Sequence, residues 1–237
     1  MEHRNRATGW QHAKLSGHKN EALVKKDFQQ RFLNMVDRSN ETIIKTSIGG
    51  LHETSLFSVN GNKTKSKTDL KVYLSNNELI NISIKKSLSG QVYFVRAGLF
   101  IDTFEKQFGT KIPGFVQRAI NLFWSGADDA VDIIEEFADK SNKSVFELQV
   151  RHKSLNATTL QNYDKNLYLD LLNWFVDNAH KLAKLSFSMG AVLDQNEWSD
   201  FVWYVNLVGE NDTNEIFYIN DVCDAVQQVA EKETYFS

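Results

Sequence analysis

Three polar residues in the middle of the chain, Asp69, Ser83 and Lys85, have types and a spacing that could do chemistry. Apolar and polar residues alternate over residues 69–75 and 79–87, with turn-forming asparagines between them, which predicts an antiparallel hairpin. In such a hairpin the three side chains share one polar face. A carboxylate can hold Mg²⁺ against a phosphate, and a neighbouring ammonium group can orient or deprotonate water, as phosphodiester hydrolysis requires. An ordinary exposed hairpin would show the same alternation.

A fourth candidate, Glu21, begins a segment with helical periodicity over residues 21–37. It stands three residues before Val24 and seven before Phe28, so its carboxylate lies at the edge of the apolar stripe. An unpaired buried charge is costly, and we expect Glu21 to have a partner, either the same metal ion or Lys85. The alternative is an acid at a helix N-terminus, stabilised by the helix dipole alone.

These candidates lie in three short strings of sequence. The strings are Gly17-His18-Lys19-Asn20-Glu21, Lys67-Thr68-Asp69 and Ile82-Ser83-Ile84-Lys85-Lys86-Ser87. Together they resemble the PD-(D/E)XK nuclease superfamily, in particular type II restriction endonucleases of the MspI-like group and, more distantly, the mismatch-repair nicking enzyme MutH. The resemblance covers about residues 17–96, under half of the chain. It implies a restriction-endonuclease-like core with a central mixed sheet flanked by helices, Mg²⁺ as cofactor and double-stranded DNA as partner.

The resemblance also implies roles for the individual residues. Asp69 would be the principal metal ligand, Lys85 would position the attacking water, and Glu21 would match the helix glutamate of several of these nucleases. Ser83 stands where the superfamily usually has Glu or Asp, and a neutral hydroxyl is a poor ligand for Mg²⁺. Relatives with Gln or Asn there imply that the second acid is dispensable. The backbone carbonyl of Ile84 or the carboxylate of Glu21 is expected to complete the metal site.

Contacts to DNA are expected from two further segments. In such enzymes the segment after the catalytic strand often enters a DNA groove, where Gln, Lys and Arg side chains can read base edges. The expected base- and phosphate-contacting residues are Lys86, Ser87, Ser89, Gln91 and Arg96. Contacts to phosphates alone are expected from Lys63, Lys65 and Lys67. The alternatives are a flexible Ser/Gly turn for the first segment and a solvated basic loop for the second.

The distribution of charge supports a polyanionic partner although the net charge of the 237 residues is −3. Residues 1–125 contain 19 Lys and Arg against 10 Asp and Glu, a net charge of +9, whereas residues 126–237 contain 8 against 20, a net charge of −12. The positive charge gathers in the half that holds the candidate residues. We expect a single nuclease domain over residues 1–237, with a basic catalytic half at about 1–125 and an acidic, mainly helical half at about 126–237.

Other kinds of site find little support in the sequence. The single cysteine, Cys223, excludes an internal disulfide framework and a multi-cysteine zinc site, and we expect it to be a packed core residue. The six histidines show no metal-binding spacing, and nucleotide-binding glycine motifs are absent. Since the sequence has neither a long apolar run nor a secretory signal, we expect a cytoplasmic protein without membrane contact, either a monomer or a homodimer.

The periodicity predicts an α/β (α+β) domain with mixed strands and helices. Helices are expected at 21–37, 98–108, 114–124, 128–140, 159–185 and 221–232, and strands at 42–48, 54–59, 69–75, 79–87, 91–95, 200–208 and 215–220. Trp174 and Phe175 are expected in the core rather than in a base-stacking platform.

The function that these features favour is that of a type II restriction endonuclease, which hydrolyses duplex DNA at a short specific sequence with Mg²⁺. One alternative is a mismatch-repair or structure-specific nuclease of the same fold. The other is a non-catalytic DNA-binding or DNA-mimicking regulator, whose acidic half would serve as the decoy surface.

Overall fold

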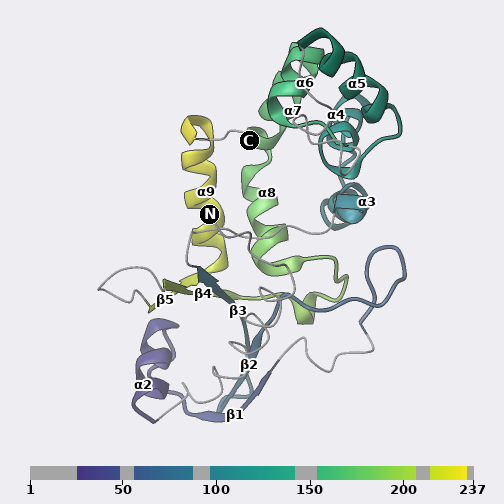
Figure 1. The fold of residues 1–237 in the computed structure, drawn as a ribbon. Helices are drawn as coiled ribbons and strands as arrows, with labels where there is room; N and C mark the ends of the chain where they lie inside the picture. Colours follow the sequence, from purple (N-terminus) through teal and green to yellow (C-terminus); the bar gives the residue numbers. More distant parts are fainter. Residues whose placement is uncertain (1–25, 49–55, 88–96, 142–153, 207–213, 234–237) are drawn as a thin grey trace, which may run out of the picture. The chain divides into compact units, whose positions relative to one another are not determined.

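A computed structural model describes residues 26–48, 56–87, 97–141, 154–206 and 214–233 (Figure 1). The chain divides into two compact units. Among the described residues, the first unit holds residues 26–46 and Val72–Leu79, and the second holds Ser47–Lys71 and everything from Ile80 onward. All three hairpin candidates of the sequence analysis therefore belong to the second unit.

Five strands form one mixed sheet in the order β1-β2-β3-β4-β5. Their bounds are Ile43–Ile48 for β1, Leu70–Leu74 for β2, Leu79–Ser87 for β3, Phe201–Asn206 for β4 and Asn214–Tyr218 for β5. Strand β4 runs parallel to β3, with Ile82 opposite Phe201, and antiparallel to β5. The expectation of a mixed sheet with flanking helices is confirmed.

The β2–β3 hairpin forms where the alternation predicted it, and β3 has the expected bounds. Its turn places Asn77 at a φ of 67°, a conformation that asparagine tolerates better than most residues. On one face of β3, Ile80 and Ile82 are buried, and on the other face Asn81 and Ser83 are buried as well. Because both faces are covered, the hairpin is not the plain exposed one that the same alternation would also allow.

Eight α-helices cover the rest of the described chain. They are α2 (Lys26–Met35), α3 (Ala97–Phe108), α4 (Gly114–Ile120), α5 (Asp129–Ser141), α6 (Ala157–Tyr163), α7 (Lys165–Asp177), α8 (Ala179–Lys184) and α9 (Ile219–Glu233). A π-helical turn at Asn121–Ser125 continues α4, and another at Leu185–Met189 continues α8. Within the described residues no helix is both long and apolar enough to cross a bilayer.

The main core of the second unit lies among α3 to α7 and is rich in aromatic side chains. Phe100 is fully buried, its ring lies 5.2 Å from that of Trp124 and 6.3 Å from that of Trp174, and it stacks on Phe175. Trp174 and Phe175 thus pack in the core, as expected. These contacts explain why this part of the chain holds together without a sheet beneath it.

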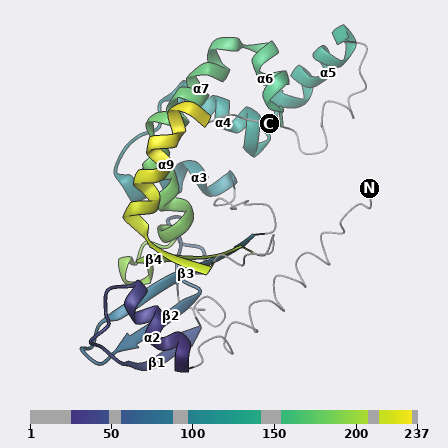
Figure 2. The same cartoon turned by 90° about the vertical axis from the view of Figure 1, so that its left-hand side faces the viewer.

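A smaller core joins α8 and α9 to the sheet. The two helices pack against each other, as Figure 1 shows, and α9 lies above β4 in both views (Figures 1 and 2). Cys223 of α9 is fully buried there with Ala183 and Val202, and burial raises the pKa of its thiol to about 11. It is a packed side chain, as expected.

The expected helix over residues 159–185 is wrong, because α6, α7 and α8 divide this stretch. Asp164 adopts an extended conformation, with φ −148°, and its side chain accepts the backbone N–H groups of Asn166 and Leu167 as the N-cap of α7. Asn178, with φ −111°, separates α7 from α8. Periodicity alone did not reveal these breaks, since the apolar pattern continues through both.

Two other expected elements differ or fall outside the described residues. The described part of the expected strand 54–59 forms only isolated bridges, from Phe57 to Lys63 and from Ser58 to Val192. The strand expected at 91–95 and the first turn of the helix expected at 21–37 lie outside the described residues.

Candidate active site

Asp69, Ser83 and Lys85 converge at the open end of the β2–β3 hairpin. Asp69 directly precedes β2, and its carboxylate Oδ2 accepts the backbone N–H of Ile84 at 2.7 Å. The Lys85 ammonium donates to the buried Ser83 hydroxyl, which also hydrogen-bonds the Asp69 carboxylate. The backbone N–H of Asp69 donates to Ile82 O at 2.8 Å, which fixes the start of β2 against β3. The three residues therefore form one hydrogen-bonded group, called the catalytic cluster after the role that the sequence leads us to expect for it.

Lys67 interacts electrostatically with Asp69 and Lys85 of the cluster, a role for which its place in the sequence gave no prediction. Its side chain is half-buried, and its stem passes over Gly190 so closely that a Cβ at Gly190 would lie 2.8 Å from Lys67 Cγ. Gly190 also has a φ of +56°, which side-chain-bearing residues rarely adopt. A glycine is therefore required at position 190 for two reasons, its backbone conformation and the passage of Lys67.

Burial and neighbouring charges shift the pKa values of Asp69, Lys85 and Lys67. Withdrawal from water is the largest cause in each case, and it raises the pKa of Asp69 while it lowers those of Lys85 and Lys67. Attraction between Asp69 and the two lysines opposes all three shifts, and repulsion from Lys85 adds to the lowering of the Lys67 pKa. Asp69 remains accessible to solvent, so water limits the shift of its carboxyl. Lys85 thus gives up its proton more readily than an ordinary lysine does.

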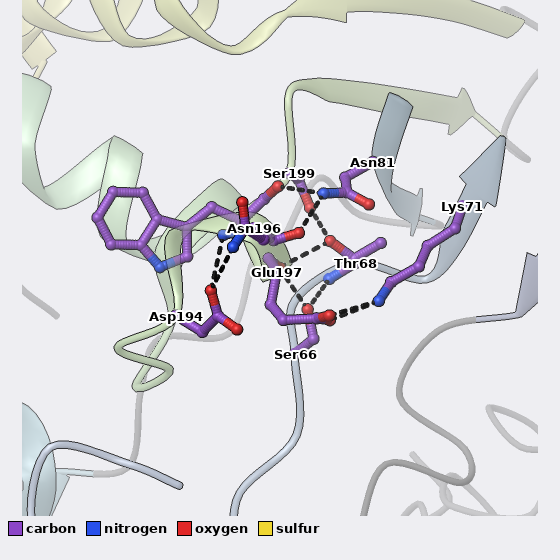
Figure 3. A network of polar contacts seen from close by, with 9 residues as sticks. Ser66, Thr68, Lys71, Asn81, Asp194, Asn196, Glu197 and Ser199 are labelled. Atoms are coloured by element: carbon purple, nitrogen blue, oxygen red, sulfur yellow. Dashed lines mark hydrogen bonds and ion pairs between the residues drawn. The ribbon is translucent and has the colours of Figure 1, made fainter. Parts of the chain in front are cut away.

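A loop from a distant part of the chain holds the segment that carries Asp69 (Figure 3). The backbone carbonyl of Glu197 accepts the hydroxyls of Ser66, at 2.6 Å, and of Thr68, at 3.0 Å. Lys71 Nζ donates to both oxygens of the Glu197 carboxylate, at 2.6 and 2.7 Å. Glu197 therefore contacts the chain on both sides of Asp69.

The same loop is joined to β3. The Asn81 side-chain amide donates to the backbone carbonyls of Asn196, at 2.8 Å, and Trp198, at 3.0 Å, as Figure 3 shows. The backbone N–H of Asn81 donates to the Asp200 carboxylate at 2.8 Å. Both strands that bear the catalytic cluster are thus tied to residues 196–200, which restricts how far Asp69 and Lys85 can move apart.

Sequence reasoning missed the loop residues for a plain reason. Glu197 lies 126 residues from Lys71, and no motif or charge pattern links the two positions. Only the parallel pairing of β3 with β4, which directly follows the loop, brings them together. Lys67 was predicted to contact phosphates because of its charge. Its contact with Gly190 joins residues far apart in the sequence, and no local pattern predicts it.

The donor groups of the cluster fit Mg²⁺ provided that phosphate and water complete its coordination. Asp69 supplies one carboxylate, and the Ile84 carbonyl faces the same side of β3 as the Ile84 N–H that Asp69 accepts. Magnesium commonly takes one or two carboxylates and fills its other positions with water and substrate phosphate. Among the described residues no group of three or more His, Cys, Asp or Glu side chains could hold a metal ion.

Four of the remaining predicted site residues belong to the described part of the chain, and four do not. Lys63 and Lys65 lie exposed in the segment before Lys67, where Lys63 forms an isolated bridge with Phe57. Lys86 and Ser87 belong to β3, but their side chains are not described. The other four, Glu21, Ser89, Gln91 and Arg96, lie outside the described residues.

Comparisons with known proteins find similarity in structure only. No protein-family model matches the sequence, and no curated protein sequence matches it either. The structure is similar to the crystal structure of restriction endonuclease MspI in complex with its cognate DNA, with a TM-score of 0.46 and 13% sequence identity, over 87% of this chain and 68% of that chain. A similarity this low does not establish a shared activity, which must be argued from the residues of the catalytic cluster.

Proposed function

We propose that this protein is a Mg²⁺-dependent endonuclease that hydrolyses phosphodiester bonds of double-stranded DNA at a short specific sequence, as type II restriction endonucleases do. The observation that carries the proposal is the convergence of Asp69, Ser83 and Lys85 at one end of the β2–β3 hairpin. An acid and a lysine with a lowered pKa, joined through a buried hydroxyl, are the groups that metal-assisted hydrolysis needs.

Each residue of the cluster has a distinct part in the proposed reaction. Asp69 holds the metal ion, with the Ile84 carbonyl as a further ligand, and the Ile84 N–H fixes the orientation of the carboxylate. Bound Mg²⁺ supplies positive charge at the scissile phosphate and makes a coordinated water more acidic. Lys85 orients the attacking water. After its ammonium has released a proton to solvent, the free amine accepts the proton of that water, and the lowered pKa of Lys85 favours this unprotonated form. Hydrolysis is expected to leave 5′-phosphate and 3′-hydroxyl ends.

Ser83 acts on Lys85 rather than on the metal ion. Its hydroxyl is fully buried and accepts a hydrogen bond from the Lys85 ammonium, so it holds Lys85 beside Asp69. A carboxylate at this position would raise the pKa of Lys85, whereas a neutral hydroxyl leaves it low. The departure from the usual acid is therefore compatible with hydrolysis, at the expected cost of weaker metal binding. Glu21 remains our candidate for a further metal ligand.

Contacts to DNA are assigned by the same reasoning. Lys63 and Lys65 are exposed near the cluster in the sequence and would bind phosphates on either side of the cut. The residues expected to contact bases are Lys86, Ser87, Ser89, Gln91 and Arg96.

Sequencing the ends of digested DNA tests the proposal. Purified protein is incubated with long linear genomic DNA and Mg²⁺, and the fragment ends are sequenced. The expected result is discrete fragments whose ends share one short sequence, which gives both the site and the stagger. Cleavage confined to branched junctions or nicking of marked duplexes would favour the structure-specific or mismatch-repair alternative. Binding without cleavage would favour the DNA-binding regulator, and neither binding nor cleavage would contradict the proposal.

A further inference from the structure

Lys67 is a half-buried cation that has neither a hydrogen-bond acceptor nor an ion-pair partner among the described residues. It differs in this from Lys71, which lies in the same segment and is paired with Glu197 at 2.6 Å. A cation removed from water without a partner is costly, and Lys67 is also repelled by Lys85. The fold therefore holds Lys67 where the charged form of its side chain is less stable than it would be in water.

The position of Lys67 is fixed by Gly190. The Lys67 stem crosses Gly190 with Cγ, Cε and Cδ at 2.8, 3.2 and 3.5 Å from the place that a Cβ would occupy, so any other residue would displace it. Lys67 is thus held at Gly190, close enough to Asp69 and Lys85 to interact electrostatically with both, whereas Lys63 and Lys65 are exposed.

Together with Lys67, the cluster contains two ammonium groups and one carboxylate, and so has one positive charge in excess. A metal ion held by Asp69 would increase that excess. An anion bound between the two lysines would neutralise it, and the phosphodiester of DNA is the anion that the proposed reaction places there.

We propose that Lys67 is a second ammonium group of the active site, held in place by Gly190, and that it binds the non-bridging oxygens of the reacting phosphate. This inference rests on the proposed function and deepens it, since Lys67 then acts on the reacting group and Lys63 and Lys65 act on the phosphates around it. Negative charge on these oxygens is neutralised by Lys67 as the water attacks.

Cleavage kinetics of Lys67 variants test this role. In Lys67→Met the stem over Gly190 is kept and the charge is lost, and we expect kcat to fall by about 10- to 100-fold, the range for one charge-assisted hydrogen bond made in the transition state. We expect Lys67→Arg to recover part of this loss, because it restores the charge. If Lys67→Met cuts as fast as wild type, or if Lys67→Arg is no better than Lys67→Met, the proposal is overturned.

Two glycine variants distinguish the effect on kcat of displacing Lys67 from the effect of backbone strain. Gly190→Ala places a Cβ against the Lys67 stem, whereas Gly109→Ala changes a glycine with a similar φ of +61° that has no atom within 4 Å of its would-be Cβ. Both variants are strained, and only the first displaces Lys67. We expect kcat to fall in Gly190→Ala, as in Lys67→Met, and to be unchanged in Gly109→Ala. Equal kcat values in the two variants would overturn the proposal.

Chemical labelling tests the anion site without relying on cleavage. The full-length protein is acylated at its lysines, with and without inorganic phosphate or a mixed-sequence DNA duplex and with chloride at equal ionic strength, and each lysine is quantified by mass spectrometry. Phosphate and duplex are both expected to slow acylation of Lys67 by about tenfold once about nine sites in ten are occupied. Exposed Lys165 serves as the reference.

The labelling result keeps the two proposals distinguishable. If wild type cuts no DNA but phosphate protects Lys67, the nuclease assignment fails and the anion site stands. If wild type cuts DNA but neither phosphate nor duplex protects Lys67, the nuclease assignment stands and the role of Lys67 is overturned.

Discussion

At the scale of single residues, the catalytic cluster is built around a serine instead of a second acid. The Ser83 hydroxyl is buried and touches both Asp69 and Lys85, so it joins the two groups without adding negative charge. Together with Lys67, the cluster therefore has one positive charge in excess before substrate binds. Burial is the largest cause of the lowered pKa values of Lys85 and Lys67 beside this carboxylate, and repulsion from Lys85 adds to the shift of Lys67.

Such a cluster reduces stability, and Lys67→Met is expected to stabilise the folded protein. At neutral pH the folded state holds an ammonium at residue 67 that burial and Lys85 disfavour, and methionine removes this cost while it keeps the stem. We expect the Tm to rise by a few degrees, since each 1 kcal/mol changes the Tm of a chain of this size by about 2–4 °C. Thermal unfolding measured by circular dichroism checks this.

The advantage of Lys67→Met should depend on pH in a defined direction. Because the pKa of Lys67 is lower in the folded than in the unfolded state, the stabilisation is full below the folded value and declines as pH rises from there toward the ordinary lysine value of 10.5. A variant that is less stable than wild type at neutral pH, or an advantage that grows above pH 9 or so, would contradict this account of the cluster.

At the scale of elements, the cluster depends on a loop that joins two distant parts of the chain. Residues 196–200 contact β3 through Asn81 and the segment before β2 through Ser66 and Thr68. The Lys71–Glu197 ion pair, with side chains only 13% and 16% exposed, closes this arrangement next to Asp69. The loop is thus the element that keeps the two strands in register at the cluster.

Replacing Glu197 tests this element. Glu197→Gln leaves the Lys71 ammonium without its carboxylate, and we expect the free energy of unfolding to fall by about 1–3 kcal/mol, the cost of losing a hydrogen-bonded charged partner. Cleavage should slow as well, because Asp69 is held less firmly. Chemical denaturation measures the first effect and single-turnover cleavage the second.

The matched control for Glu197→Gln is Asp129→Asn, which breaks the ion pair of Asp129 with Arg118. That pair is 2.9 Å long with side chains 49% and 44% exposed, and its loss should cost less than about 1 kcal/mol. If the two substitutions lower the free energy of unfolding equally, the Lys71–Glu197 pair stabilises the protein no more than a surface ion pair does.

The sequence predicted elements best where a single local pattern decides the structure. Strand β3 was predicted with its bounds because Ile80, Ile82 and Ile84 alternate with polar residues on a hairpin strand. The long helix over 159–185 was wrong because capping by Asp164 and the break at Asn178 interrupt a continuous apolar pattern. The candidate site was predictable for the hairpin residues, which are close in sequence.

The other parts of the site were not predictable because they depend on long-range packing. Glu197 reaches Lys71 only after β4 has paired with β3, and Lys67 is placed by its contact with Gly190, more than a hundred residues later. Expected roles for Glu21, Ser89, Gln91 and Arg96 stay predictions.

At the scale of the whole molecule, the charge of the chain is divided between its halves, with +9 in residues 1–125 and −12 in residues 126–237. Under the proposed function, an acidic half would repel DNA and favour approach by the basic half, which holds the catalytic cluster and the exposed Lys63 and Lys65. Under the proposed function, this division orients the protein on its substrate before any base is read.

The salt dependence of DNA binding tests this division of charge. Replacing both Lys63 and Lys65 by alanine should weaken binding equally on all sequences and reduce the slope of log K against log salt by about 2, since each phosphate contact contributes about 0.9. The measurement is a titration of cognate and unrelated duplexes between about 50 and 200 mM salt. The control with the same change in charge replaces the exposed Lys165 and Lys232 of the acidic half and should leave the slope unchanged. A slope that changes equally in both double variants would contradict a localised phosphate-binding surface.

The most direct test of the central claim compares cleavage and binding in Asp69→Asn and Lys85→Met. Each variant is assayed with Mg²⁺ on DNA that wild type cuts, beside Asp170→Asn and Lys165→Met as exposed controls with the same chemical change. The account predicts that cleavage by both cluster variants falls by at least about 10²- to 10⁴-fold, the usual contribution of a positioned acid–base group, while duplex binding persists and both controls cut normally. Cleavage at the wild-type rate by either cluster variant would show that the reaction occurs elsewhere.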